Sequence, residues 1–458
     1  DPFDELEWGH VPVAGAADVR AAVAAARAAF PGWSRTALIQ RVGILDAWAR
    51  LIREHAGELA RLQVHENGKT ITEMGHAAGS AAMSADYFGH LAMSSHGVVV
   101  EPFFPGYEAW TRREPLGVVA AIAPWNNPLA LLAWKLFPAL ATGNTVVVKP
   151  SEVTPVSTLL LARLGIEAGI PAGVINVVTG AGESGRLLAD DPDIDKIAFT
   201  GSTAVGKLIA RSAADRLLRT TLELGGKGPN IVFADADLDR AVPGLLTGII
   251  AGTGQACNAG SRLLIADEVY EEVVVRLKIE LAKVRIGDPL DPTVIVGPLA
   301  SGPHFAKVCS YLDLAAEEGH TLLAGGQRAN EIDGVESGFF VQPTIFATDD
   351  PHARLVQEEI FGPVGAVIRF STEEEAIRIA NDIPFGLVAG LWTQNVDRAH
   401  RVSRQLQAGT IWINTWRVFS PNVPFGGMKM SGLGREQGID ALDEYTETKA
   451  TWLAVAES

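Results

Sequence analysis

The first 95 residues carry the hydrophobic pattern of helices. Apolar residues recur there at steps of three and four with charged residues between them, at Leu38, Val42, Leu45, Trp48 and Ile52. This spacing places them on one face and predicts an amphipathic helix. Pro31-Gly32 predicts the end of the alanine-rich helix before it.

From Gly117 onward, short apolar runs alternate with helical stretches. The runs have no polar alternate positions, which is typical of parallel strands covered on both faces. The predicted strands are 117–123, 145–148, 174–178, 196–199 and 219–222. The predicted helices between them are 129–141, 155–168, 182–189 and 203–213. This alternation predicts a doubly wound α/β domain.

A second α/β pattern follows, and Gly225-Gly226 marks the predicted domain boundary. Its predicted helices are 237–251, 268–284, 304–318, 373–381 and 396–406. Its predicted strands are 262–266, 364–370, 388–393 and 410–414. The length of 458 residues agrees with two or three domains, at about 150 residues each.

Composition excludes some partners and favours one compartment. The net charge of −16 argues against nucleic acid or an anionic membrane as the main partner. Only two cysteines occur, which favours a reducing compartment, and we expect a cytoplasmic protein. The acidic N-terminus lacks the order of a signal peptide, and the start at Asp rather than Met leaves open whether residues precede it. The most apolar stretch, 128–140, is interrupted by Lys135 and Pro138, so we expect no membrane span.

Two glycine-rich segments suggest phosphate binding. Gly180–Gly185 matches G-x-G-x-x-G after a predicted strand, but no clear acidic strand end lies about 20 positions on, which disfavours a standard pyrophosphate loop. Gly201–Lys207 is one residue short of a Walker A loop, and Leu208 stands where Mg²⁺ would need a hydroxyl. The helix start after Gly201 still offers backbone N–H groups to a phosphate, which supports nucleotide binding without hydrolysis.

Two further chemistries lack their motifs. The ten histidines are scattered without H-E-x-x-H, and the cysteines lie far apart, so we expect no metal site. No G-x-S-x-G segment occurs, which disfavours a serine hydrolase of the usual α/β type.

Cys257 and Glu223 are the informative residues. Cys257 lies in the glycine-rich segment 252–262 among small polar neighbours, which suits close approach of a ligand to its sulfur. A lone cysteine is more often an inert buried residue, and Cys309 on a predicted helix fits that description. Glu223 ends a predicted strand between leucines and before paired glycines, where loss of water would raise its pKa toward that of a general base.

Eight segments, in family order and at family spacing, resemble the aldehyde dehydrogenase superfamily from about Leu6 to Leu453. They are Pro124–Pro128, Lys149–Glu152, Phe199–Ser202, Glu223–Lys227, Gly254–Cys257, Glu358–Pro363, Pro424–Gly427 and Ser431–Glu436. Any one of them would be weak, and together they are specific.

The resemblance implies an α/β fold of the aldehyde dehydrogenase type, with a doubly wound nucleotide-binding domain, a second α/β catalytic domain and a small β oligomerisation flap. The implied boundaries are 1–96 and 115–224 for the nucleotide-binding domain, 225–430 for the catalytic domain, and 97–114 and 445–458 for the flap. Family members are usually dimers or tetramers, so we expect a homodimer or a homotetramer.

The resemblance also implies the chemistry. Cys257 would attack the aldehyde carbon, and the side-chain amide of Asn126 with the backbone N–H of Cys257 would stabilise the oxyanion. Hydride transfer to NAD then leaves a thioester, and Glu223 would activate the water that hydrolyses it. A glutamate in this place distinguishes hydrolytic members from many that pass the acyl group to coenzyme A.

Seven residues match cofactor-binding positions of the family: Trp125, Lys149, Glu152, Gly201, Ser202, Glu359 and Phe361. Lys149 and Glu152 match residues that bind the adenosine ribose, and Ser202 matches a pyrophosphate contact. Glu359 and Phe361 match residues that hold the nicotinamide ribose and ring. The Glu152 carboxylate would repel a 2′-phosphate, so NAD is favoured over NADP.

Nine residues match the substrate channel: Asn127, Leu131, Trp134, Ala256, Asn258, Trp416, Arg417, Phe419 and Phe425. This mostly aromatic and apolar lining favours a neutral aromatic or medium-sized aldehyde. Arg417 would either stack on a ring or pair with an acid at a subunit contact, or it would bind the distal carboxylate of a semialdehyde. Semialdehyde-oxidising relatives often carry a second basic residue on the helix before the flap, and 81–86 offers none.

Four alternatives stay open from the sequence. A semialdehyde dehydrogenase would prefer aldehydes that carry a carboxylate. A coenzyme-A-acylating relative would form acyl-CoA, and an NADP-preferring member would use the other cofactor. A catalytically silent member would give no burst of NADH.

Overall fold

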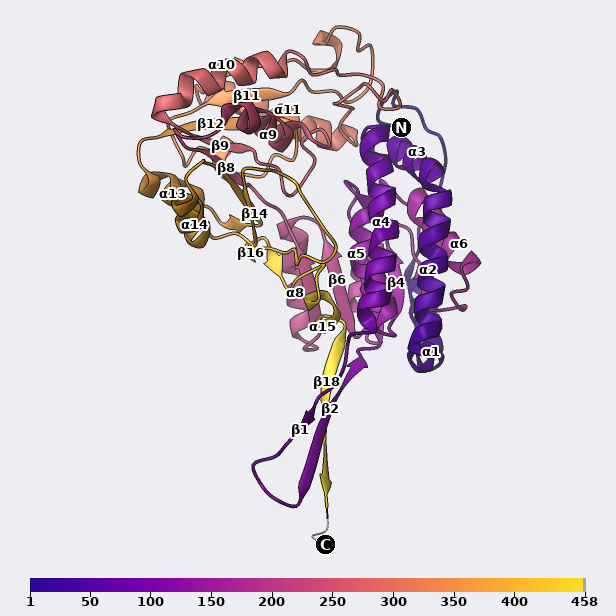
Figure 1. Ribbon diagram of the computed structural model, residues 1–458. Coiled ribbons are helices and arrows are strands. Elements are labelled where there is room, and N and C mark those ends of the chain that lie inside the picture. Colours follow the sequence, from indigo (N-terminus) through magenta and orange to yellow (C-terminus); the bar gives the residue numbers. More distant parts are fainter. Residues whose placement is uncertain (456–458) are drawn as a thin grey trace.

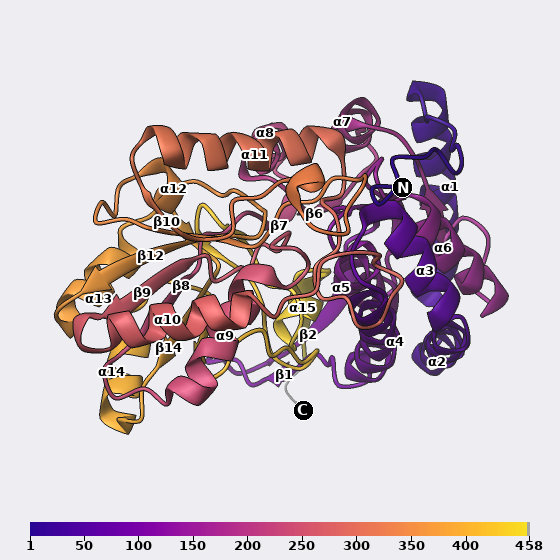
Figure 2. The same ribbon diagram turned by 90° about the horizontal axis from the view of Figure 1, so that it is seen from above.

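The computed structural model describes residues 1–455 as two α/β regions that lie side by side, with a narrow sheet projecting away from them (Figures 1 and 2). None of the helices within these residues combines the length and the apolar character that crossing a bilayer would require.

Four helices form the N-terminal region: α1 (Ala16–Arg35), α2 (Leu38–Glu54), α3 (Ala56–Asn67) and α4 (Ile71–Ala92). The predicted apolar stripe of α2 is buried at Val42, Leu45, Trp48 and Ile52. Helix α4 packs against α2 on one side and against α5 (Pro128–Ala141) on the other. The hydrophobic spacing therefore predicts both the helix and its buried face.

The expected end of α1 at Pro31-Gly32 is wrong, because the helix continues through both residues to Arg35. A proline inside a helix removes one backbone hydrogen bond. Here the next turn carries Trp33, which is buried and donates its indole Nε1–H to the carbonyl of Leu140 on α5 at 3.2 Å. The burial of this large ring against α5 holds the turn that the proline weakens.

The first α/β region is built on a six-stranded sheet. Its strands are β3 (Val118–Ile122), β4 (Thr145–Lys149), β5 (Ile175–Val177), β6 (Lys196–Thr200), β7 (Arg219–Glu223) and β17 (Gly432–Leu433). The order is β17-β7-β6-β3-β4-β5, parallel except for β17, which runs antiparallel to β7. The other helices of this region are α6 (Val156–Glu167), α7 (Gly182–Asp190) and α8 (Thr203–Ala214). The chain places β4 and β5 on one side of β3 and then β6 and β7 on its other side, so the strand order reverses between β3 and β6. Ligands bind doubly wound sheets at the carboxyl ends of the strands beside such a reversal.

The second region is built on a seven-stranded sheet in the order β10-β11-β12-β9-β8-β14-β15. Its strands are β8 (Pro229–Val232), β9 (Arg262–Ala266), β10 (Thr321–Ala324), β11 (Thr344–Ala347), β12 (Val364–Phe370), β14 (Val388–Trp392) and β15 (Thr410–Ile413). Its helices are α9 (Leu238–Ile250), α10 (Tyr270–Leu281), α11 (Gly302–Glu317), α12 (Arg354–Gln357), α13 (Glu373–Asn381) and α14 (Val396–Gln405). The chain passes from the first sheet to the second between Glu223 and Pro229.

Three short elements complete the description near the end of the chain. Strands β13 (Phe385–Gly386) and β16 (Met428–Lys429) pair antiparallel, and α15 (Asp440–Asp443) precedes the last strand.

The projecting sheet consists of β1 (Val99–Val100), β2 (Tyr107–Pro115) and β18 (Thr446–Ala454) (Figure 1). Strands β2 and β18 pair antiparallel along their whole length, although they come from opposite ends of the chain. Large apolar side chains are exposed on and beside it: Val98, Val99, Phe103, Phe104, Tyr107, Trp452 and Leu453. The expected flap at 445–458 includes residues 456–458, which lie outside the described residues.

Candidate active site

The carboxyl ends of four parallel strands bring polar and charged side chains to one edge of the six-stranded sheet. Asn126 follows β3, Lys149 ends β4, Gly201-Ser202 follow β6, and Glu223 ends β7. Ladder pairing sets Thr200 opposite Glu223, so the last residues of β6 and β7 lie beside each other. Ser202 begins α8, and its hydroxyl accepts the backbone N–H of Val205.

A cavity of about 220 Å³, the sheet-edge cavity, opens at this edge. Its lining residues are Pro124, Trp125, Asn126, Thr200, Gly201, Ser202, Glu223, Leu224, Gly225, Cys257, His304, Lys307, Glu359 and Phe361. It lies where the strand order reverses, between the segments that follow β3 and β6. Five of the seven residues predicted for cofactor binding line it: Trp125, Gly201, Ser202, Glu359 and Phe361.

Aromatic rings form one wall of the sheet-edge cavity. Trp125 and Phe361 meet edge to face, with ring centroids 5.3 Å apart. Burial lowers the pKa of His304 to about 4, so the neutral ring donates from Nε2 to the Phe361 carbonyl at 2.8 Å. Phe361 itself has φ +65°, a conformation that few residues other than glycine adopt. This strained residue is held in place by the packing on both sides.

Glu359 is the acid at the floor of the same cavity. Its Oε1 accepts the backbone N–H of Gly226 at 2.9 Å, and burial raises its pKa. A side chain on Gly226 would place its Cβ only 2.3 Å from the carbonyl oxygen of Cys257. Glycine at this position therefore allows the turn after β7 to pack directly on the Cys257 loop.

Cys257 lies in the loop between α9 and β9, and its thiol is free. Burial raises the pKa of the thiol to about 12, and the carboxylates of Glu359 and Glu223 add to the effect. Arg417 and Lys69 act in the opposite direction. The uncharged thiol is therefore the resting form at neutral pH.

Asn126 lines the sheet-edge cavity together with Cys257. Its side-chain Nδ2 donates to the carbonyl oxygen of Gln255 at 2.9 Å, two residues before the cysteine. An amide nitrogen carries two hydrogens, so one donor remains for a ligand. The hydrogen bond to the cysteine loop fixes the amide relative to the sulfur.

Glu223 is the second acid of the sheet-edge cavity, and it is only 4% exposed. Neither of its carboxyl oxygens has a hydrogen-bond partner among residues 1–455. Burial and the neighbouring Glu436 raise its pKa well above the usual value, whereas Lys135 lowers it. Lys135 itself is buried and donates to the Glu436 carboxylate at 2.6 Å. A buried acid without partners suits proton exchange with a water or ligand in the cavity.

A second cavity of about 400 Å³, the helix-side cavity, lies on the other side of Cys257. It is lined by Lys69, Glu73, Met74, His76, Ala77, Ser80, Asn126, Asn127, Ala130, Leu131, Trp134, Thr247, Ala256, Cys257, Asn258, Trp416, Arg417, Phe419 and Phe425. All nine residues predicted for the substrate channel are among them. Cys257 and Asn126 are common to both cavities.

Lys149 and Glu152, the other two predicted cofactor residues, lie outside the lining of both cavities. They form an ion pair of 3.5 Å in which Lys149 is buried and the Glu152 side chain is 56% exposed. The segment Gly180–Gly185 follows the edge strand β5 and is closed by local packing, since Ser184 Oγ donates to the Ala14 carbonyl at 2.7 Å. The segment therefore lies away from the strand reversal between β3 and β6.

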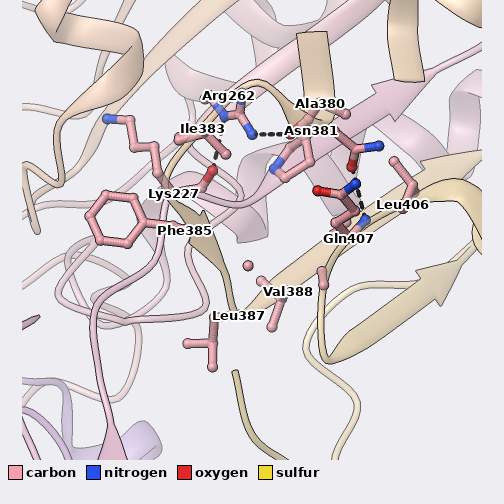
Figure 3. A pocket seen from close by; sticks show the side chains of 14 residues that line it. Lys227, Arg262, Ala380, Asn381, Ile383, Phe385, Leu387, Val388, Leu406 and Gln407 are labelled. Carbon is pink, nitrogen blue, oxygen red and sulfur yellow. Dashed lines mark hydrogen bonds between the residues drawn. The ribbon is translucent and has the colours of Figure 1, made fainter. Parts of the chain in front are cut away.

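Arg262 holds the chain at Lys227, in the segment between β7 and β8 (Figure 3). Its guanidinium is fully buried and donates to the carbonyls of Lys227 at 2.9 Å and Ala380 at 2.8 Å. The space beside it is only about 10 Å³, roughly the size of one water. This small pocket is a packing feature rather than a place for a ligand. Within residues 1–455, no group of three or more His, Cys, Asp or Glu side chains is placed to hold a metal ion.

Comparison with known proteins decides the family. A sequence profile described as the aldehyde dehydrogenase family matches residues 1–451. The chain belongs to the aldehyde dehydrogenase family.

Relatives at high coverage agree with this assignment. The putative aldehyde dehydrogenase DhaS of Bacillus subtilis strain 168 is 44% identical over 442 residues, which are 96% of this chain and 88% of that protein. Betaine aldehyde dehydrogenase of the same strain is 42% identical over 452 residues, or 98% and 92%. Crystal structures of PnpE from Pseudomonas sp. WBC-3, and of PnpE in complex with nicotinamide adenine dinucleotide, match with a TM-score of 0.97 at 44% identity. Each covers 100% of this chain and 94% of the other, which confirms the predicted fold.

Sequence reasoning missed two charged residues of this aldehyde dehydrogenase. Lys69 and Glu73 line the helix-side cavity from the α3–α4 connection and the start of α4. The stretch in which the family pattern predicts a second basic residue, 81–86 on α4, contains none. Gly68, which ends α3 at φ +73°, was the available signal, because it turns the chain immediately before Lys69.

Proposed function

We propose that the protein oxidises an aldehyde to the carboxylic acid, with Cys257 as the nucleophile and NAD as the hydride acceptor. The observation that carries the proposal is the position of Cys257 and Asn126, which line both the sheet-edge cavity and the helix-side cavity. A nucleophile between two cavities can meet a cofactor from one side and a substrate from the other.

The residues fit a dinucleotide at the sheet edge. A cavity with an aromatic wall at Trp125 and Phe361, a carboxylate at Glu359 and the start of α8 at Ser202 suits a nicotinamide, a ribose and a pyrophosphate. NAD, when bound, supplies the acceptor for the hydride. Lys149 and Glu152 would hold the adenosine ribose, and the exposed Glu152 carboxylate would disfavour NADP. The NAD complex of PnpE supports the same choice.

The remaining roles follow from the contacts. The Cys257 thiol would give its proton to a water molecule in the cavity, and the sulfur would add to the aldehyde carbon. The oxyanion that forms accepts hydrogen bonds from the free Asn126 amide hydrogen and the Cys257 backbone N–H. Loss of hydride leaves a thioester on the sulfur. Glu223, buried with both oxygens free, then takes a proton from the attacking water, and the acid is released.

The substrate body would lie in the helix-side cavity. Trp134, Trp416, Phe419 and Phe425 supply aromatic walls, which favours an aromatic or medium-sized aldehyde. The buried Glu223 also favours water over coenzyme A as the acyl acceptor.

The same proposal extends to assembly and location. We place the nucleotide-binding domain at 1–96 and 115–224, the catalytic domain at 225–430, and the flap at 97–114 and from 445 onward. The exposed apolar side chains of the flap favour a homodimer or homotetramer, which sedimentation of the purified protein would measure. Both cysteines are free, which favours the cytoplasm.

An NADH-release screen tests the function. The protein is mixed with NAD and with aliphatic, aromatic and acidic aldehydes, and the product is identified by mass spectrometry. We expect NADH and the carboxylic acid in equal amounts. Acyl-CoA formed only when coenzyme A is added would assign the coenzyme-A-acylating reaction instead.

A further inference from the structure

The helix-side cavity contains two cations without an acid in contact. Lys69 and Arg417 both line it, and neither side chain forms a hydrogen bond or an ion pair within residues 1–455. Buried charges are normally paired, because the loss of water costs several kcal/mol per ion. A cation that lines a cavity without a partner is therefore a candidate contact for an anionic ligand.

Lys69 is held in place by its own backbone. The residue is 1% exposed, and its N–H donates to Asn67 Oδ1 at 3.0 Å. Burial lowers the pKa of Lys69 to about 8, and Arg417 acts in the same direction, whereas Glu73 and Cys257 raise it. The ammonium is therefore still mostly charged at pH 7.

Gly252, in the Cys257 loop, packs directly against this ammonium. The glycine has φ +63°, and a Cβ there would lie 2.6 Å from Lys69 Nζ. Any side chain at this position would be strained and would displace the ammonium. The glycine therefore keeps the Lys69 ammonium close to the loop that carries the nucleophile.

Arg417 lines the same cavity from the loop after β15. It is half-buried next to the buried Trp416, and it adopts φ +58°. It stacks on no ring and pairs with no acid among residues 1–455, although the sequence favoured one of those uses or a subunit contact. The guanidinium donors of Arg417, which lines the cavity, are therefore not used within the described chain.

Glu73 is the one acid among the lining residues of this cavity, and it is already engaged. Its Oε1 accepts the backbone N–H of Gly252 at 2.7 Å, whereas Oε2 is buried without a partner. Two cations and one carboxylate leave an excess of one positive charge, in a chain whose net charge is −16. The cavity is thus a local exception to the charge of the whole protein.

We propose that the substrate is an aldehyde that carries a carboxylate remote from its carbonyl group, and that Lys69 and Arg417 bind this carboxylate. The aromatic walls of the cavity would hold the body of the molecule between the carboxylate and Cys257. This inference rests on the proposed function, and it replaces the neutral aldehyde that the sequence favoured from the absence of a basic residue at 81–86.

A matched pair of substrates tests the proposal. Initial rates are measured with NAD and either 4-carboxybenzaldehyde or 4-methylbenzaldehyde, which differ in charge at the far end of one ring. We expect wild type to favour the carboxylate by at least about tenfold in kcat/KM. Arg417→Met should remove most of that preference through a higher KM for the carboxylate, and it should reduce kcat/KM for the methyl compound much less than for the carboxylate. Lys69→Met should act in the same direction, and the loop position of Arg417 keeps the test valid if the buried Lys69 variant does not fold.

Lys278→Met is the control, because Lys278 lies exposed on α10 far from both cavities and forms no ion pair within the described chain. It should leave both substrates unchanged. Equal losses on both aldehydes in Arg417→Met would mean that the cations act on the Cys257 thiol rather than on the substrate, which overturns the proposal. A wild-type enzyme without preference for the carboxylate overturns it as well.

Alkylation of Cys257 separates this proposal from the proposed function. Iodoacetate and iodoacetamide transfer similar groups to a thiolate with loss of iodide, and only iodoacetate is an anion. The ratio of their rates at Cys257, followed by mass spectrometry without NAD, should fall at least about fivefold in Arg417→Met and stay constant in Lys278→Met. A falling ratio in a protein that oxidises no aldehyde would contradict the proposed function but support anion binding by Lys69 and Arg417. A constant ratio in a protein that does oxidise aldehydes would contradict only the proposal that Lys69 and Arg417 bind an anion.

Discussion

The two cavities that meet at Cys257 differ in charge and in the way the chain builds them. The sheet-edge cavity is lined by two acids, Glu223 at the end of β7 and Glu359, and by one lysine, Lys307. The helix-side cavity carries Lys69 and Arg417 on loops and helix ends. The acids raise the pKa of the Cys257 thiol and the cations lower it, although burial has the largest effect.

Because burial and the two acids outweigh the two cations, Cys257 is not a thiolate at neutral pH before the reaction begins. Its pKa near 12 leaves the reactive form rare at neutral pH, so a proton must leave as the reaction begins. The acidic side is suited to receive protons, whereas the cationic side is suited to hold negative charge on the substrate. The two sides therefore contribute different steps.

The largest effect is expected where the cavities meet. Cys257→Ala should lower aldehyde oxidation by at least ~10⁴-fold, because the covalent intermediate is lost. NAD affinity, measured by calorimetry, should stay within about threefold, since the sheet-edge cavity keeps its other contacts. Turnover close to wild type would remove Cys257 from the mechanism.

The pH dependence of Cys257 alkylation tests the balance of charges directly. A thiol whose pKa is about 12 loses its proton progressively as pH rises, so the rate with iodoacetamide should increase about tenfold per pH unit from pH 7 to 10. An ordinary thiol would level off above its pKa of about 8.5. Measurement on the protein without NAD, with Cys257 modification resolved from Cys309 by mass spectrometry, checks this slope. A plateau below pH 9 would show that the cations prevail over burial.

Removal of the Glu223 carboxylate from the sheet-edge cavity should slow hydrolysis of the thioester more than hydride transfer. Glu223→Gln keeps the size of the side chain and removes the base, so steady-state turnover should fall about a hundredfold. The pre-steady-state burst of NADH should fall much less, because hydride transfer precedes hydrolysis. Stopped-flow absorbance measures both phases. A burst reduced in proportion to turnover would instead make Glu223 necessary for acylation.

The smallest effect is expected at the far end of the sheet edge. Glu152→Ser removes an exposed carboxylate that lies 3.5 Å from Lys149. The ratio of kcat/KM for NADP to that for NAD should rise up to about tenfold, because the repulsion of a 2′-phosphate is partly screened by solvent. Arg163→Gln, an exposed change on α6, serves as the control for general charge effects. An unchanged ratio would show that Glu152 does not face the ribose.

The sheet-edge cavity could be predicted from the sequence better than the helix-side cavity. Buried parallel strands leave continuous apolar runs, and their carboxyl ends share one edge, so Glu223 follows from a local pattern, whereas Asn126 came only from the family resemblance. Lys69 did not follow, because its position depends on how α3 and α4 pack against the Cys257 loop. Strands β8, β10 and β11 were also missed.

The antiparallel strand β17 has a consequence for the making of the protein. It joins the first sheet beside Glu223 only after residue 432 has been synthesised, and Glu436 follows it directly. Lys135 precedes this partner by 301 residues along the chain. At about 5–20 residues per second, that is roughly 15–60 s during which a lysine destined for the interior has no acid to neutralise it. The surroundings of Glu223 are therefore among the last parts of the molecule to form on the ribosome, and a chain cut short before Glu436 would lack them altogether.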